Sequence, residues 1–264
     1  MPKMDGWKVA ETLKANPELM EKADESVYRL LMEKFTLGLF ENPYVDADSA
    51  NAKVGKAEYQ QKADLAMRKS IVLLRNENVN NNRALPLRAS TKIYFETYMQ
   101  RKDQAPGSIF KGETNNWNVE FVDTPEAADV VLLWIKPKSK SLFESDGSPL
   151  YLSLSKNGVD VNYINTLIAK KPTILAINFT NPWVIDEIYS TSSKNIQGVL
   201  ATFGTTPEAL LDIITGRVNP SGKMPFTTPI SENAAQNQKS DVPGNMEGPA
   251  YALFKFDEGL RYKH

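Results

Sequence analysis

Two carboxylic acids, Glu144 and Asp146, lie in the middle of the stretch from Lys136 to Leu154. The residues just before it, Asp129–Ile135, form an almost wholly apolar run that predicts a buried strand. Serines, prolines and a glycine keep the following stretch out of regular structure. In open α/β sheets, ligands bind in loops of this kind, at the carboxyl ends of the strands. The two acids are therefore candidates for general acid/base chemistry, although taken alone they also fit two solvated loop residues.

Other catalytic chemistries lack the residues that they need. The chain has no cysteine, which excludes disulfides, thiol nucleophiles and thiolate metal sites. Its one histidine, His264, is the terminal residue, where neither a histidine-built zinc site nor a Ser-His-Asp triad is expected to form. We therefore expect no cofactor and no bound metal.

Charge and hydropathy narrow the range of partners. The 31 basic and 32 acidic residues leave a formal net charge of -1, so the chain has no overall field to attract a polyanion or an anionic membrane. No stretch approaches the roughly 20 apolar residues of a membrane-spanning helix, and residues 1–22 are too charged for a secretory signal. We expect no nucleic-acid or membrane partner. The location is expected to be periplasmic or secreted if a preceding region carried a signal, and cytoplasmic otherwise.

Six candidate strands precede or alternate with helical segments, as in a mostly parallel sheet with helices on both faces. The candidates are Ser70–Leu74, Lys92–Tyr98, Asn118–Val122, Asp129–Ile135, Thr173–Phe179 and Gly198–Phe203. Several are continuous apolar runs, which suits strands that are buried on both faces. The pattern predicts an α/β fold: a three-layer sandwich with a doubly wound, Rossmann-like sheet, preceded by a helical arm.

Three helices between the strands have readable caps. Residues 160–170 carry apolar side chains on one face. In residues 205–216, Thr206 and Pro207 predict a helix start and Gly216 its end. In residues 180–188, Asn181 and Pro182 predict a helix by the same logic.

The apolar spacing also divides the chain along its length. Residues 24–39 predict an amphipathic helix that ends near Gly38, and residues 46–62 predict a polar linker into a second helix at 63–70. The predicted parts are a helical arm and linker at 1–50, an α/β sandwich domain at 51–230 and a C-terminal tail at 231–264 that returns to the domain.

Four segments, in this order and spacing, resemble the C-terminal half of family 3 glycoside hydrolases. DESVYRLLMEKFTLGLFENPYVD (24–46) resembles the helix by which the family leaves its catalytic barrel, and LAMRKSIVLLRNENVNNNRALPL (65–87) is similar to the helix, strand and loop that follow. DIITGRVNPSGKMPFTTP (212–229) resembles the closing helix and its NPSGK-type turn. FKFDEGLRY (254–262) is similar to the terminal F-G-x-G-L-x-Y motif, with Asp257 where glycine is usual.

The resemblance implies a β-glucosidase-like retaining glycosidase that acts on a β-linked glucoside or oligosaccharide. It implies that Glu144, ahead of Leu150, Leu152 and Leu154, is the acid/base residue, with Asp146 as a reserve candidate or a supporting group. The family's nucleophilic aspartate comes from a TIM barrel, commonly within an S-D-W-like stretch, and this sequence contains no S-D-W. We therefore expect the chain to be inactive alone and to need a family 3 barrel in cis or in trans.

Two alternatives come from other functional classes. The first is a non-catalytic split subunit or carbohydrate-binding partner that docks on a separate barrel chain through the arm at 24–46. The second, more remote alternative is a receiver-like signalling domain, because residues 1–17 resemble the M-P-x-M-D-G stretch of response regulators. A receiver's phospho-accepting aspartate closes a strand just before that stretch, and here nothing precedes Met1.

Overall fold

A computed structural model describes residues 6–79, 82–99, 116–138, 151–190, 193–239, 241–242, 244 and 246–262. The chain divides into two compact units, Met1–Tyr59 and Gln60–His264, and the boundary falls within helix α4 (Ala57–Ser70). Glu144 and Asp146 lie outside the described residues, as does His264.

The first unit consists of helices whose side chains are not buried. It contains α1 (Gly6–Ala15), a 3-10 turn (Pro17–Leu19), α2 (Met20–Thr36) and α3 (Ala47–Lys53), and none of these elements has a buried residue. Gly38, with φ of 67°, follows the end of α2 as predicted. The prediction of a linker at 46–62 is wrong in part. Asp46 caps α3 by accepting a hydrogen bond from Ser49 N at 2.6 Å, and α4 begins at Ala57.

The second unit is built on a six-stranded sheet with the order β1-β8-β7-β6-β4-β5. The strands are β1 (Val72–Asn76), β4 (Lys92–Met99), β5 (Glu120–Phe121), β6 (Val130–Lys136), β7 (Thr173–Asn178) and β8 (Ile196–Thr202). All neighbours pair in parallel except β1, which runs antiparallel to β8 at the sheet edge. The six predicted strands and the mostly parallel sheet are confirmed.

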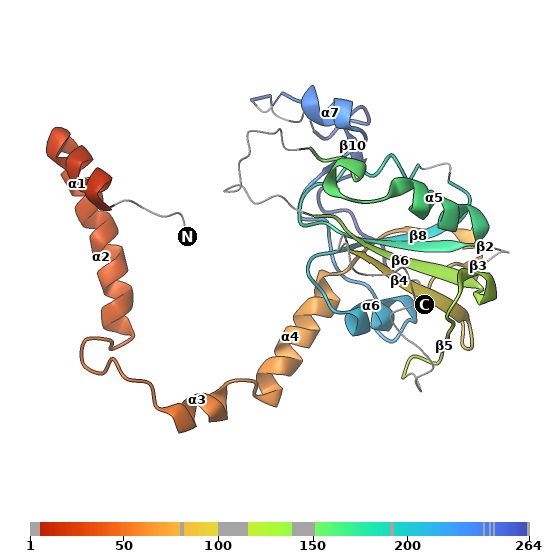
Figure 1. Ribbon diagram of the computed structural model, residues 1–264, viewed down its shortest axis with the longest axis horizontal. Helices are drawn as coiled ribbons and strands as arrows, with labels where there is room; N and C mark the ends of the chain where they lie inside the picture. Colours follow the sequence, from red (N-terminus) through yellow and green to blue (C-terminus); the bar gives the residue numbers. More distant parts are fainter. Residues whose placement is uncertain are drawn as a thin grey trace. The chain divides into compact units, whose positions relative to one another are not determined.

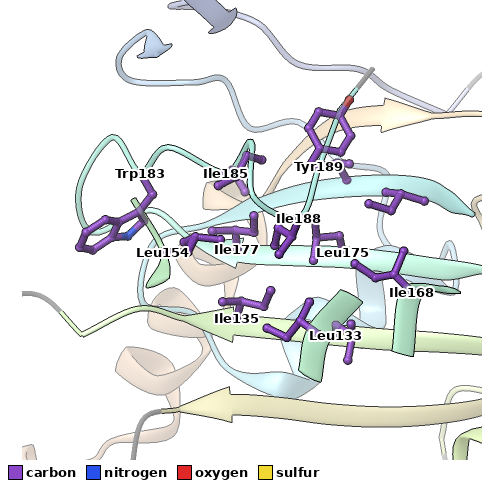
Figure 2. Close-up of a cluster of buried hydrophobic side chains, with 14 of the residues drawn as sticks. Leu133, Ile135, Leu154, Ile168, Leu175, Ile177, Trp183, Ile185, Ile188 and Tyr189 are labelled. Carbon is purple, nitrogen blue, oxygen red and sulfur yellow. The ribbon is translucent and has the colours of Figure 1, made fainter. Parts of the chain in front are cut away.

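Side chains of the sheet alternate between two buried clusters, one on each face. Leu133, Leu175 and Val199 belong to the cluster covered by α5 (Val161–Lys170), and Figure 2 shows part of this layer. Their neighbours Leu132 and Ile174 belong to the cluster covered by α6 (Pro207–Ile214). Figure 1 shows α5 and α6 on opposite sides of the sheet. Strands buried on both faces explain the continuous apolar runs, and the α/β sandwich is confirmed.

Two of the three predicted inter-strand helices form, and α6 has the predicted cap. Asp160 accepts a hydrogen bond from Tyr163 N at the start of α5, and Thr206 accepts one from Ala209 N at the start of α6. Gly216, with φ of 77°, closes the second helix.

The predicted helix at 180–188 is wrong. Residues 181–190 contain no helix: Val184 lies in a strand bridge and a turn follows at 186–188. The bridge is parallel and joins Val184 to Ser153. Tertiary pairing thus overrides the Asn181-Pro182 capping pattern.

The remaining elements belong to the C-terminal tail and a small hairpin. They are β2 (Asn78–Val79), β3 (Asn82–Arg83), β9 (Thr228–Pro229), α7 (Glu232–Gln236) and β10 (Ala252–Phe254). The strand β10 pairs with β9, and Leu260 N donates to Leu73 O at 2.7 Å, so the last residues lie against β1. A Cβ at Gly222 would lie 2.4 Å from Ile71 O, which shows why the NPSGK-type segment needs glycine there.

Candidate active-site edge of the sheet

The carboxyl ends of β4, β6, β7 and β8 lie at one edge of the sheet, and the loop that carries Glu144 and Asp146 starts there. The described chain leaves β6 through Lys136 and Lys138 and resumes at Tyr151. These residues are the two flanks of the acidic loop, and Glu144 and Asp146 lie between them, outside the described residues.

One buried residue, Asn157, contacts both flanks. Its side-chain Nδ2 donates to Tyr151 O and to Ser153 O, both at 2.8 Å, and its backbone carbonyl oxygen accepts from Lys138 N at 3.1 Å. Lys156 adds a contact from the same turn, with Nζ 3.7 Å from the Tyr151 ring centroid. Lys138, which precedes the acidic loop, and residues 151–153, which follow it, therefore both contact Asn157.

The returning flank is also anchored from a distant part of the sequence. Glu232, the first residue of α7, accepts hydrogen bonds from Ser153 N at 2.8 Å and from Leu152 N at 3.3 Å. On the other side, Leu152 O accepts from Val184 N at 2.9 Å. Leu154, two residues further on, is fully buried. These contacts fix the backbone that follows the acidic loop.

Two further carboxylates surround this flank. Glu187 accepts a hydrogen bond from Ser155 N at 2.9 Å. Burial raises the pKa of Asp186, and the negative charges of Glu187 and Glu232 raise it further. Among the described residues, no group of three or more histidine, cysteine, aspartate or glutamate side chains is placed to bind a metal ion.

Lys136, the last residue of β6, brings a positive charge to the same edge. Its Nζ lies 3.5 Å from the centroid of the fully buried Trp134 ring, and burial lowers the pKa of the lysine. Such an ammonium can donate to a hydroxyl or carboxylate that reaches the edge. Lys136 was not among the predicted site residues. Its place as the lysine that ends an apolar strand at the carboxyl end was the sequence feature that could have indicated it.

Polar side chains brace the neighbouring strand ends. Trp134 Nε1 donates to Thr202 Oγ1 at 3.0 Å, and Asn178 Oδ1 accepts from Gly204 N at 2.8 Å. Trp183 Nε1 donates to Asn178 O at 3.0 Å. These contacts join β6, β7 and β8 where the loops begin.

A buried carboxylate, Glu96, connects the sheet to α5. It is 2% exposed, and the hydroxyls of Tyr94 and Tyr163 donate to its Oε2 at 2.7 and 2.9 Å. Burial raises the pKa of Glu96, while the two tyrosine hydrogen bonds oppose that shift. The Tyr98 hydroxyl accepts from Asp160 N at 2.8 Å, so two contacts attach the first turn of α5 to β4.

Comparison with known families identifies one match. Residues 71–262 match the model described as "Glycosyl hydrolase family 3 C-terminal domain". A probable beta-glucosidase C of Aspergillus flavus is 35% identical over 246 residues, which are 92% of this chain and 35% of the relative. A periplasmic beta-glucosidase/beta-xylosidase of Dickeya chrysanthemi is 32% identical over 244 residues, which are 90% of this chain and 34% of the relative.

Solved structures share the fold at lower identity. The beta-glucosidase from Listeria innocua matches with a TM-score of 0.62 and 20% identity, over 96% of this chain and 40% of that chain. A beta-glucosidase involved in saponin metabolism from intestinal bacteria matches with a TM-score of 0.61 and 20% identity, over 97% of this chain and 46% of that chain. The chain thus spans about a third of the length of the curated relatives that it matches.

Proposed function

Because this chain belongs to glycosyl hydrolase family 3, as a match to the family's C-terminal domain, we propose that it supplies the acid/base residue Glu144 to a retaining β-glucosidase-like hydrolase. The observation that carries the proposal is the doubly anchored base of the acidic loop. Asn157 contacts its two flanks, and Glu232 holds the returning one. Flanks anchored in this way at the carboxyl ends of the strands support the assignment of the acid to the segment between them.

The mechanism is a double displacement. Glu144 protonates the glycosidic oxygen while an aspartate of another domain attacks the anomeric carbon and forms a glycosyl-enzyme. Glu144 then takes a proton from the incoming water, which releases the sugar. Asp146 is the reserve candidate for the acid/base role, or it holds Glu144 in place.

The second carboxylate comes from a family 3 barrel domain, in cis or in trans. Retaining glycosidases need two carboxyl groups roughly 5–5.5 Å apart, and a barrel of that kind takes about 250 residues. The apolar side chains of α2 support the proposal of a partner domain. Leu30, Phe35 and their apolar neighbours are exposed within the first unit and offer a surface on which such a domain can pack. The substrate is a β-linked glucoside or oligosaccharide.

The test is hydrolysis of nitrophenyl β-glucoside by three samples: the chain alone, a family 3 barrel domain alone and an equimolar mixture. We expect turnover in the mixture and none above background in either part. Turnover by the chain alone would refute the division of the catalytic pair between two domains.

The same exposed face of α2 favours a second candidate, a non-catalytic subunit or carbohydrate-binding partner that docks on a separate barrel chain. It makes a different prediction for the same samples. If the barrel alone hydrolyses the substrate and the Glu144→Gln chain stimulates it as well as the unmodified chain does, the chain acts only as a docking partner.

A further inference from the structure

Residues between Phe226 and Phe256 line an open cavity of about 650 Å³ that the proposed mechanism does not use. Phe226 and Phe256 flank the β9–β10 pair. The lining also includes residues after α7, among them Gln238, Asp241 and Glu247. The volume lies within the usual range of pockets for small molecules.

The two aromatic residues are held in different ways. The Phe226 ring packs edge-on against Phe203, with ring centroids 6.1 Å apart, and so belongs to the edge of the core. Phe256 is 68% exposed, while its backbone N donates to Thr227 Oγ1 at 3.1 Å. The Phe256 ring is therefore an exposed apolar platform on a fixed backbone.

The charged residues of the lining balance one another. Lys239 and Lys255 oppose Asp241 and Glu247, so the cavity has no net charge. Within the described part of the chain, none of these four side chains forms a hydrogen bond or an ion pair. The buried Oε1 of Gln238 likewise has no hydrogen-bond partner there. The lining thus offers solvent-exposed charged donors and acceptors of both kinds, and one buried acceptor in Gln238.

We propose that this cavity binds a neutral sugar, with one face of the sugar ring stacked on Phe256. A sugar has apolar C–H faces that match an aromatic platform and a rim of hydroxyls that both donate and accept hydrogen bonds. A phosphorylated ligand would need an excess of positive charge, and a purely apolar ligand would make no use of the four charged groups around the cavity. The choice of a β-linked glucoside within this class rests on the proposed function.

The test is isothermal titration of the 264-residue chain with cellobiose. We expect saturable binding that Phe256→Ala weakens about tenfold, as the loss of one aromatic stacking contact predicts, and that Phe256→Tyr preserves. Tyr44→Ala removes another exposed aromatic ring, 85% exposed, outside the cavity and should leave binding unchanged. Asp241→Ala is the second cavity variant. It removes an exposed carboxylate that can accept a hydrogen bond from a sugar hydroxyl, and it should also weaken binding.

Three results would overturn the inference: no heat with cellobiose, equal affinity in the unmodified chain and in both cavity variants, or saturable binding of an apolar dye without cellobiose binding. A Glu144→Gln chain separates this inference from the proposed function. If Glu144→Gln abolishes cellobiose binding while Phe256→Ala retains it, the sugar binds at the acidic loop and the cavity inference fails. If hydrolysis by the assembled enzyme does not depend on Glu144 while Phe256→Ala still loses binding, only the proposed function fails.

Discussion

Glu232 anchors the backbone that returns from the acidic loop, and its removal should loosen that flank. In Glu232→Ala, Ser153 N loses an acceptor at 2.8 Å and Leu152 N loses one at 3.3 Å. Hydrogen bonds to charged groups contribute about 1.5–3 kcal/mol each, and here one is long and both are only partly buried. The expected loss of local stability is therefore about 1–2 kcal/mol, which corresponds to roughly a 5- to 30-fold change in an opening equilibrium.

Amide hydrogen exchange measures this loss directly. The amides of Leu152 and Ser153 should exchange roughly 5- to 30-fold faster in Glu232→Ala, and Glu232→Gln, which keeps one neutral acceptor, should show about half of that free-energy change. Glu208→Ala is the matched control, because Glu208 also lies in the first turn of a helix. Unchanged exchange at residues 152 and 153 in Glu232→Ala would refute the anchoring role.

Three further predictions concern stability. Asp212→Ala should lower the free energy of unfolding by about 2–4 kcal/mol in chemical denaturation, because the carboxylate is buried and accepts from Arg68 Nε at 2.6 Å. Gly222→Ala should cost about 2–4 kcal/mol by the same measurement, since its Cβ would meet Ile71 O at 2.4 Å. Burial raises the pKa of Glu96, so the folded state holds this proton more tightly and loses stability as pH rises above about 4.5. Glu96→Gln should flatten the decline of melting temperature as pH rises above about 4.5.

Each of these predictions has a control and a contradicting outcome. In the unmodified chain Trp117 Nε1 donates to Asp212 Oδ1 at 2.8 Å, and Asp212→Asn keeps an acceptor for this bond. Asp212→Asn should therefore lower the free energy of unfolding less than Asp212→Ala does. Equal decreases would contradict the hydrogen-bond account. Gly248→Ala, where a Cβ meets no atom within 4 Å, should leave stability nearly unchanged. An unmodified slope of melting temperature against pH in Glu96→Gln would show that other groups cause the decline.

Hydrophobic pattern and helix caps were sufficient to predict the sandwich. The nearly continuous apolar runs at 129–135 and 173–179 predicted strands buried on both faces, because alternating polar positions are not needed in such strands. Thr206, Pro207 and Gly216 predicted α6 from local chemistry alone. The antiparallel direction of β1 had no local indication, since strand direction depends on pairing across the sheet.

The candidate site was less predictable because its contacts are distant in sequence. Glu232 lies some 80 positions from the backbone amides that it binds, and no spacing rule connects the two. The helix predicted at Asn181 does not form for the same reason. Val184 pairs with Ser153, and this distant contact outweighs the local preference of Asn181 and Pro182 for a helix start. The roles of Glu144 and Asp146 came from the resemblance to family 3 and stay a prediction.

The central claim is that this chain brings the acid/base carboxylate to a catalytic pair that is completed by a barrel. Glu144→Gln in the assembled enzyme tests it most directly, with two substrates that differ in leaving group. Cellobiose, whose departing hydroxyl needs a proton, should lose turnover about 10²- to 10⁴-fold, whereas a dinitrophenyl glucoside, which leaves without protonation, should still form the glycosyl-enzyme at close to the normal rate. Equal losses on both substrates, or full activity on cellobiose, would contradict the account.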